Sequence, residues 1–156
     1  MHEFRTTRRI EFADTDMAGI VHFARFFVFM ETAEHQFLRS LGTPVHFIHD
    51  GQEIGWPRVK ATCEYHNPAR LGDELQILVR VRRKGRRSMT YGFEFRREDG
   101  AERTLIAEGE VTSICCVVGA GRLREEPVPL RSTPIPAFIA DQLDEFPTPV
   151  AAGRGD

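Results

Sequence analysis

One long apolar helix constrains the fold of this sequence more than any other feature. Val28, Phe29 and Leu38 widen its apolar face beyond a single stripe, and a helix apolar over most of its circumference must be wrapped by other elements. Gly42 follows, where a left-handed glycine commonly closes a helix. The pattern predicts a helix over residues 22–41. The residues that set its three- and four-residue spacing are Phe23, Phe26, Phe27, Met30, Ala33, Phe37 and Leu41.

Alternating apolar and polar residues predict strands before and after the helix. A first strand is expected at 3–12, and four more runs lie near 59–66, 74–82, 89–95 and 103–118. The last run becomes continuously apolar from Ile114 to Val118, which predicts a bulge near Ser113 or burial on both faces. Short connections favour antiparallel neighbours. A long helix followed by an antiparallel meander predicts an α+β fold, with an irregular segment at 42–55.

Length and charge set the remaining limits. A chain of 156 residues, 41% hydrophobic and 28% charged, is long enough for one domain with a substantial core. We expect that domain at 1–146, ending in a short helix opened by Pro136, and a flexible C-terminal tail at 147–156.

A net charge of −2 gives no general attraction to nucleic acid, and no apolar run approaches the ~20 residues of a membrane span. Without an apolar signal core, a cytoplasmic location is expected.

The cysteines and histidines give no sign of a disulfide scaffold or a metal motif. An odd count of three cysteines, Cys63, Cys115 and Cys116, fits a reducing compartment, and each is interpreted as a small apolar strand residue. The six histidines show neither an HExxH motif nor paired metal spacing. No metal site is therefore expected.

An acidic loop with Asp14, Asp16 and Gly19 precedes the helix. The first N–H groups of a helix lack helical partners and carry partial positive charge, so they can polarise a carbonyl or hold an oxyanion. A carboxylate just upstream can act as a nucleophile or a general base. Aspartates near helix starts also serve as caps and turn formers. The local pattern leaves both interpretations open.

The segment DTDMAGIVHFARFFVFMETAEHQFL, at 14–38, resembles the signature of the 4-hydroxybenzoyl-CoA thioesterase family, including its YbgC-type acyl-CoA thioesterases. PARLGDEL at 68–75 is similar to the family's segment at the same place, and the order of elements agrees over about 1–136. The resemblance implies a hotdog fold, an antiparallel sheet wrapped around a long central helix. It also implies that Asp16 is the catalytic carboxylate and that a backbone N–H near Phe23 polarises the thioester carbonyl.

Other residues near the helix start are candidates for positioning the substrate. Gly19 and Phe23 belong to the resembling segment, and His22 stands where close relatives often carry an aromatic residue. His22 would either orient substrate or water, or pack and cap the helix. Glu31 would be either a helix-borne base, as in some hotdog thioesterases, or a charge at the surface or a dimer contact.

Six basic residues surround Gly85, the expected hairpin tip. The resemblance implies a contact with the phosphates of coenzyme A, for which Arg86, Arg87 and Ser88 are the candidates. The alternative is a charged turn that discourages strand-to-strand aggregation. The basic residues are Arg80, Arg82, Arg83, Lys84, Arg86 and Arg87.

The resemblance implies an acyl-CoA thioesterase that needs no cofactor, because coenzyme A is part of the substrate. The acyl group, aromatic or aliphatic, is not indicated. A homodimer or homotetramer is expected, with neither nucleic acid nor a membrane span as a partner. The alternative function is a non-catalytic hotdog protein that binds acyl-CoA or an acyl carrier protein. The dehydratase branch ranks last, because its His-Phe-Pro-type motif is absent.

Overall fold

The computed structural model describes residues 3–119 and 129–147. The expected tail at 147–156 therefore lies, apart from Pro147, outside the described residues. The elements are β1 (Glu3–Arg9), the 3-10 turn η1 (Phe12–Asp14), α1 (Arg25–Ser40), β2 (Phe47–His49), β3 (Gln52–Gly55), β4 (Arg58–Tyr65), β5 (Glu74–Lys84), β6 (Ser88–Asp99), β7 (Glu102–Ile114), β8 (Cys116–Val117), β9 (Arg131–Ser132) and α2 (Ala137–Ala140).

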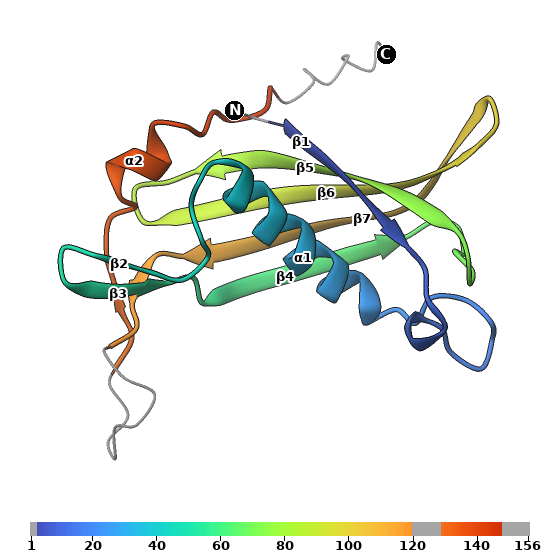
Figure 1. The fold of residues 1–156 in the computed structure, drawn as a ribbon, viewed down its shortest axis with the longest axis horizontal. Helices are drawn as coiled ribbons and strands as arrows, with labels where there is room; N and C mark the ends of the chain where they lie inside the picture. Colours follow the sequence, from blue (N-terminus) through green and yellow to red (C-terminus); the bar gives the residue numbers. More distant parts are fainter. Residues whose placement is uncertain (1–2, 120–128, 148–156) are drawn as a thin grey trace, which may run out of the picture.

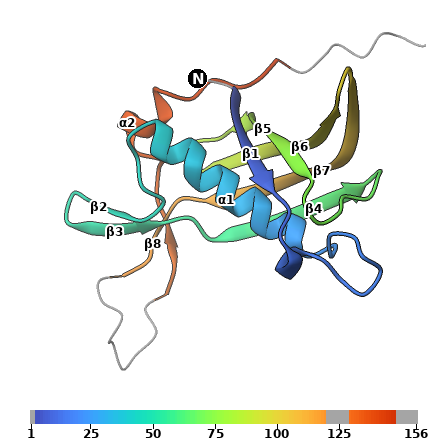
Figure 2. The ribbon, with the colours of Figure 1, turned by 45° about the vertical axis from the view of Figure 1, so that its right-hand side comes forward.

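A five-stranded antiparallel sheet, in the order β1-β5-β6-β7-β4, curves around α1 (Figure 1). Figure 2 shows α1 crossing one face of this sheet. The apolar face of the helix fits closely against β7 because Gly109 has no side chain. A Cβ there would lie 2.5 Å from the sulfur of Met30. This arrangement confirms the α+β prediction and the sheet wrapped around a central helix.

The core is built from the inward faces of α1 and the long strands. On α1, Phe26, Phe29, Met30 and Phe37 are each at most 4% exposed. Apolar residues of β5 and β6 alternate with polar ones, as their sequences predict. The core therefore holds the start of α1 in a fixed place relative to the sheet.

One of the two alternatives predicted for the end of β7 is confirmed, namely burial on both faces. The register between β4 and β7 does shift opposite Ser113, but the extra residue is Val59 of β4 and not a residue of β7. Beyond Ser113, Cys115 and Cys116 are both buried. There the chain leaves the main sheet for a small sheet of order β2-β3-β8-β9.

Three expectations differ from the structure. The helix begins at Arg25 rather than residue 22, because the chain from His22 to Ala24 forms a turn. Residues 42–55 are not wholly irregular, since they contain β2 and β3. The helix expected up to residue 146 ends at Ala140, although the chain continues to Leu143, which is buried.

β4 forms one edge of the main sheet, and most of its residues are exposed. Its apolar residues do not form a buried face, in contrast to those of β5 and β6. Val59 is 56% exposed and Tyr65 is 47% exposed. Neither described helix is long and apolar enough to span a membrane.

Candidate active site

The acidic loop before α1 is a compact turn. Thr15 and Val21 form an antiparallel bridge, and the Asp16 N–H donates to the Ile20 carbonyl at 2.9 Å. Gly19 donates its N–H to the Asp16 carbonyl at 3.0 Å and has φ +77°, a conformation that glycine adopts without strain. These backbone bonds hold the Asp16 side chain at a defined position above the helix start.

Asp14 is wholly buried and occupied by structural contacts. Its carboxylate accepts hydrogen bonds from Arg25 at 2.7 Å, from Arg8 at 2.9 Å and from the Glu11 N–H at 2.9 Å. Burial raises the pKa of Asp14, but the bonds from Glu11, Arg25 and Arg8 outweigh it and hold the pKa below its usual value. Asp14 therefore ties β1, the loop and α1 together.

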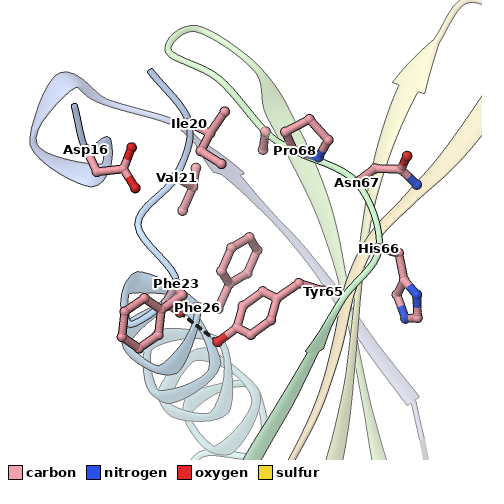
Figure 3. A pocket seen from close by; sticks show the side chains of 10 residues that line it. Asp16, Ile20, Val21, Phe23, Phe26, Tyr65, His66, Asn67 and Pro68 are labelled. Carbon is pink, nitrogen blue, oxygen red and sulfur yellow. Dashed lines mark hydrogen bonds between the residues drawn. The ribbon is translucent and has the colours of Figure 1, made fainter. Parts of the chain in front are cut away.

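Asp16, by contrast, is only partly buried and has no ion pair within the described residues. One carboxylate oxygen accepts the Ala18 N–H at 2.8 Å. No hydrogen bond from the described chain occupies the other oxygen. The side chain lines a pocket of about 450 Å³ (Figure 3). The pocket is lined by Asp16, Ile20, Val21, Phe23, Phe26, Tyr65, His66, Asn67, Pro68 and Ala69.

The start of α1 forms one wall of this pocket. Ala24 precedes the helix without a side-chain cap, and its N–H donates to Nδ1 of His22 at 3.2 Å. The Phe23 N–H has no hydrogen-bond partner in the part of the chain that the structure describes. This N–H is free to donate a hydrogen bond to a ligand oxygen, and it belongs to a residue that lines the same pocket as Asp16.

Tyr65, at the end of β4, connects the opposite wall to the helix start. Its hydroxyl donates to the Phe23 carbonyl at 2.9 Å (Figure 3). Burial raises the pKa of Tyr65 to about 12, so the hydroxyl stays protonated as a donor at neutral pH. The ring also packs edge-on against Phe26, with centroids 5.5 Å apart. The wall is therefore apolar and rigid beside the free Phe23 N–H.

The structure separates the predicted positioning residues. Phe23 lines the pocket, whereas Gly19 and His22 do not. Gly19 shapes the turn, and the His22 ring stacks on Phe23 with centroids 4.6 Å apart. The backbone N–H of His22 donates to the Asp14 carbonyl. His22 thus packs and orders the helix start in this structure.

Arg86, Arg87 and Ser88 lie at the opposite end of the sheet from Asp16 (Figure 1). The acidic loop contacts the sheet near the start of β5. The basic β5–β6 hairpin lies after the end of β5, which is 11 residues long. At ~3.3 Å per residue this strand spans about 35 Å. Within one chain, Asp16 and the basic hairpin therefore do not form a single site.

Sequence reasoning missed part of the pocket wall and one buried carboxylate. His66 and Asn67 line the pocket but lie just beyond a strand, where no motif marks them. Glu34, on the apolar face of α1, is 1% exposed and lies 2.7 Å from Arg58. Neither of its carboxylate oxygens has a well-aligned hydrogen bond. Glu34 could have been recognised from the sequence, because it is a charged residue at a helix position whose spacing places it on the apolar face.

Glu34 lies beneath a second hollow between α1 and β4. Glu31 is at its edge, with 58% of its side chain exposed. The hollow has a volume of about 220 Å³ and is lined by Phe27, Val28, Glu31, Glu34, Arg58, Ala61 and Val111. Its mostly apolar lining opens toward the exposed edge strand.

Comparisons with known proteins place this geometry in context. The sequence pattern of the thioesterase superfamily matches residues 18–104. A putative esterase of Aquifex aeolicus is 31% identical over 114 residues, 69% of this chain and 88% of that protein. The acyl-CoA thioester hydrolase YbgC of Escherichia coli is 32% identical over 115 residues, 72% of this chain and 81% of that protein. A solved gentisyl-coenzyme A thioesterase is 28% identical, with a TM-score of 0.70 over 87% of this chain and 98% of its own.

Proposed function

Because this chain belongs to the thioesterase superfamily, we propose that it hydrolyses acyl-CoA thioesters with Asp16 as the catalytic carboxylate. The family relation makes the chain a thioester hydrolase, and its relatives include proteins named for acyl-CoA and naphthoyl-CoA hydrolysis. One observation carries the assignment of Asp16. A carboxylate with a free oxygen lines the same apolar pocket as Phe23, whose N–H is also free.

The proposed chemistry divides the work between these two groups. Asp16 either attacks the thioester carbon, giving an acyl anhydride that water then hydrolyses, or takes a proton from an attacking water. In both routes the carbonyl oxygen becomes negative, and the Phe23 N–H at the start of α1 stabilises that charge. The sulfur leaves as the thiol of coenzyme A. A carboxylate, a backbone N–H and water suffice, so the proposal requires no cofactor.

The carrier end of the substrate would be held by a second copy of the chain. If two β4 edges pair antiparallel, the start of one β4 lies beside the end of the other. The β5–β6 hairpin lies at the end of the sheet where β4 begins, whereas Asp16 lies near the end of the sheet where β4 finishes. Antiparallel pairing of the two β4 strands would therefore bring the partner's hairpin close to Asp16. A homodimer or dimer of dimers therefore belongs to the proposal, with Arg86 and Arg87 as contacts for the phosphates.

The described pocket suits an apolar acyl group, aromatic or aliphatic, because most of its lining residues are apolar or aromatic, among them Phe23, Phe26 and Tyr65. We further propose that residues 1–146 act as one domain and that it works in the cytoplasm. The three free cysteines support the second point.

The test compares Asp16→Asn with the wild type on a panel of aromatic and aliphatic acyl-CoA esters. We expect kcat to fall by roughly 10²–10⁴, the usual scale for loss of a general base and the minimum for loss of a nucleophile. Binding of a non-hydrolysable acyl-CoA analogue should stay within about tenfold, because the carboxylate acts mainly on the transition state.

Asp14→Asn is the matched control, because the same substitution two residues away should cost far less turnover. If Asp14→Asn is inactive and Asp16→Asn is active, the assignment of Asp16 is wrong. If the wild type binds the analogue but hydrolyses none of the panel, the chain is an acyl-CoA or acyl-carrier-protein binding protein.

A further inference from the structure

A group of three potential metal ligands lies on the outer face of the main sheet, the face opposite to α1. Glu108 of β7 is next to Gly109, which faces Met30 of the helix, so Glu108 points to the other face. Glu64 of β4 is directly opposite Glu108 in the strand register. Nε2 of His66 lies 3.1 Å from a carboxylate oxygen of Glu108. One ligand atom from each of the three residues lies within 4.8 Å of the others.

Arg82 lines the same hollow as Glu64 and Glu108, but it forms no ion pair with either carboxylate. Like charges directly opposite each other on neighbouring strands are destabilising. Glu94, next along the same row on β6, is held by Arg80 at 2.8 Å and by Arg96 at 2.7 Å. No arginine or lysine within residues 3–119 and 129–147 forms an ion pair with Glu64 or Glu108. Two carboxylates and an imidazole therefore share one exposed position, with no arginine or lysine of the described residues in ion-pair contact with the carboxylates.

We propose that Glu64, His66 and Glu108 bind a divalent transition-metal ion of the zinc class. Strand geometry puts residues i and i+2 on one face beside the residue opposite, so all three side chains reach one point. An imidazole nitrogen with two carboxylate oxygens suits zinc, whereas magnesium and calcium prefer ligands that are all oxygen. Three protein ligands leave the remaining positions to water.

Bound metal would fasten the edge strand to its neighbour beside the pocket. After Tyr65 the chain already bonds to β7, through the His66 N–H to Ile106 at 2.9 Å and the Asn67 side chain to Leu105 at 2.7 Å. Figure 3 shows the His66 imidazole on the side of the chain away from Asp16. The metal has no part in the thioester chemistry, so this site and the proposed function stand or fall separately.

The test measures metal binding directly on the full-length, tag-free protein after dialysis against a chelator. Calorimetric titration with zinc chloride should give saturable binding of one ion per chain, and magnesium chloride should give none. Thermal unfolding should move to higher temperature with zinc, because the ion binds only where the fold brings its ligands together.

Two ligand variants and one matched control locate the site. Glu64→Gln and Glu108→Gln should each weaken zinc binding by at least about tenfold. Mutating a residue that only hydrogen-bonds to a metal ligand already lowers metal affinity by about this much. Glu110→Gln, two residues along β7 and also exposed, should stay within about twofold. These side chains are solvent-accessible, so far-UV circular dichroism should show that every variant keeps its fold.

The proposal is overturned by either of two results. One is the absence of saturable zinc binding by the folded wild type at micromolar concentrations. The other is binding that survives Glu64→Gln and Glu108→Gln, or that falls equally with Glu110→Gln, because the ion would then sit elsewhere.

Discussion

Asp14 and Asp16 are identical residues in one loop, but they have different environments. Asp14 is buried between Arg8 and Arg25, and its pKa lies below the usual value because the bonds it accepts outweigh its burial. Asp16 lies at the surface of the pocket, and one of its oxygens accepts no hydrogen bond from the described residues. A reactive carboxylate must be accessible to substrate, and only Asp16 meets that condition.

Asp14→Asn should therefore destabilise the fold. Asparagine removes the charge that two guanidinium groups share, and we expect a loss of about 1.5–3 kcal/mol in the free energy of unfolding. Because the pKa of Asp14 is lowered by folding, its contribution is full above the pKa of an unfolded aspartate. It is lost as pH falls through the folded pKa, so the two proteins should converge in acid. Urea unfolding at pH 7 and pH 3 measures this, and an unchanged difference at both would contradict it.

Glu34 should show the opposite dependence on pH. Burial raises the pKa of Glu34 from 4.5 to about 7, despite the attraction of Arg58 and with a small addition from Glu31. Between these pH values the folded protein keeps a proton that the unfolded chain releases, so stability falls as pH rises. The total change should be about 3 kcal/mol, complete above the folded pKa.

The check is to compare the wild type with Glu34→Gln, which cannot ionise, by urea unfolding at several pH values from 5 to 8. The charged and titratable groups that act on Glu34, which are Arg58, Glu31 and Tyr91, are the same in both proteins. Only the wild type should lose stability from pH 5 to 7. Parallel curves for the two proteins would show that Glu34 does not titrate in this range.

At the scale of elements, the β5–β6 hairpin uses its basic residues in two ways. Lys84 donates to the carbonyls of Ala140 and Leu143, which anchors the segment around α2, and Arg80 bridges Glu3 and Glu94. Arg86 has no side-chain partner within the described residues, and Arg87 has a single bond, to Ser132 at 3.1 Å. Lys84 and Arg80 therefore stabilise the fold, whereas Arg86 and Arg87 are available to bind a ligand.

Changing Arg86 and Arg87 together to alanine should raise KM for acyl-CoA more than it lowers kcat. Because the two phosphate contacts are exposed to solvent, we expect KM to rise by about 3- to 30-fold. This increase is smaller than the one expected for the loss of two desolvated ion pairs. Hydrolysis of a short acyl-pantetheine thioester, which lacks the nucleotide, should barely change. Arg103→Ala, in the other long hairpin, is the matched control. Equal losses on both substrates would indicate a structural role for the hairpin.

The sequence predicted those elements whose residues repeat with a local period. The α1 stripe and the alternation in β5 and β6 encode burial directly, so their type and approximate extent follow from spacing. β2 and β3 were missed because they lie in a segment rich in glycine and proline, and β3 pairs with the distant β8. The resemblance singled out Asp16, but local spacing could not join Tyr65 to Phe23 or His66 to Glu108. Those pairs are 42 residues apart in the sequence.

The whole molecule leaves one side without a partner. β4 is an exposed edge, and next to it Phe23 is 62% and Val28 is 41% exposed. Exposed strand edges and grouped apolar side chains are liabilities that proteins commonly cover. The hollow above Glu34 lies along the same side, between α1 and β4. A second copy of the chain would cover the edge, the apolar residues and the hollow together.

We therefore expect a dimer or a dimer of dimers in sedimentation velocity at micromolar concentration, and a stable monomer would contradict this. Val28→Asp places a charge where two helices would meet, so it should shift the protein toward monomer. Because Val28 is exposed, the fold should survive, which circular dichroism can verify. Ile48→Asp is the matched control, since Ile48 is 77% exposed on the remote β2 and should leave assembly unchanged. Monomeric Val28→Asp should also have a higher KM for acyl-CoA, because Asp16 would no longer face the partner's basic hairpin. If the monomer keeps the wild-type KM for acyl-CoA, the carrier does not bind across the two chains.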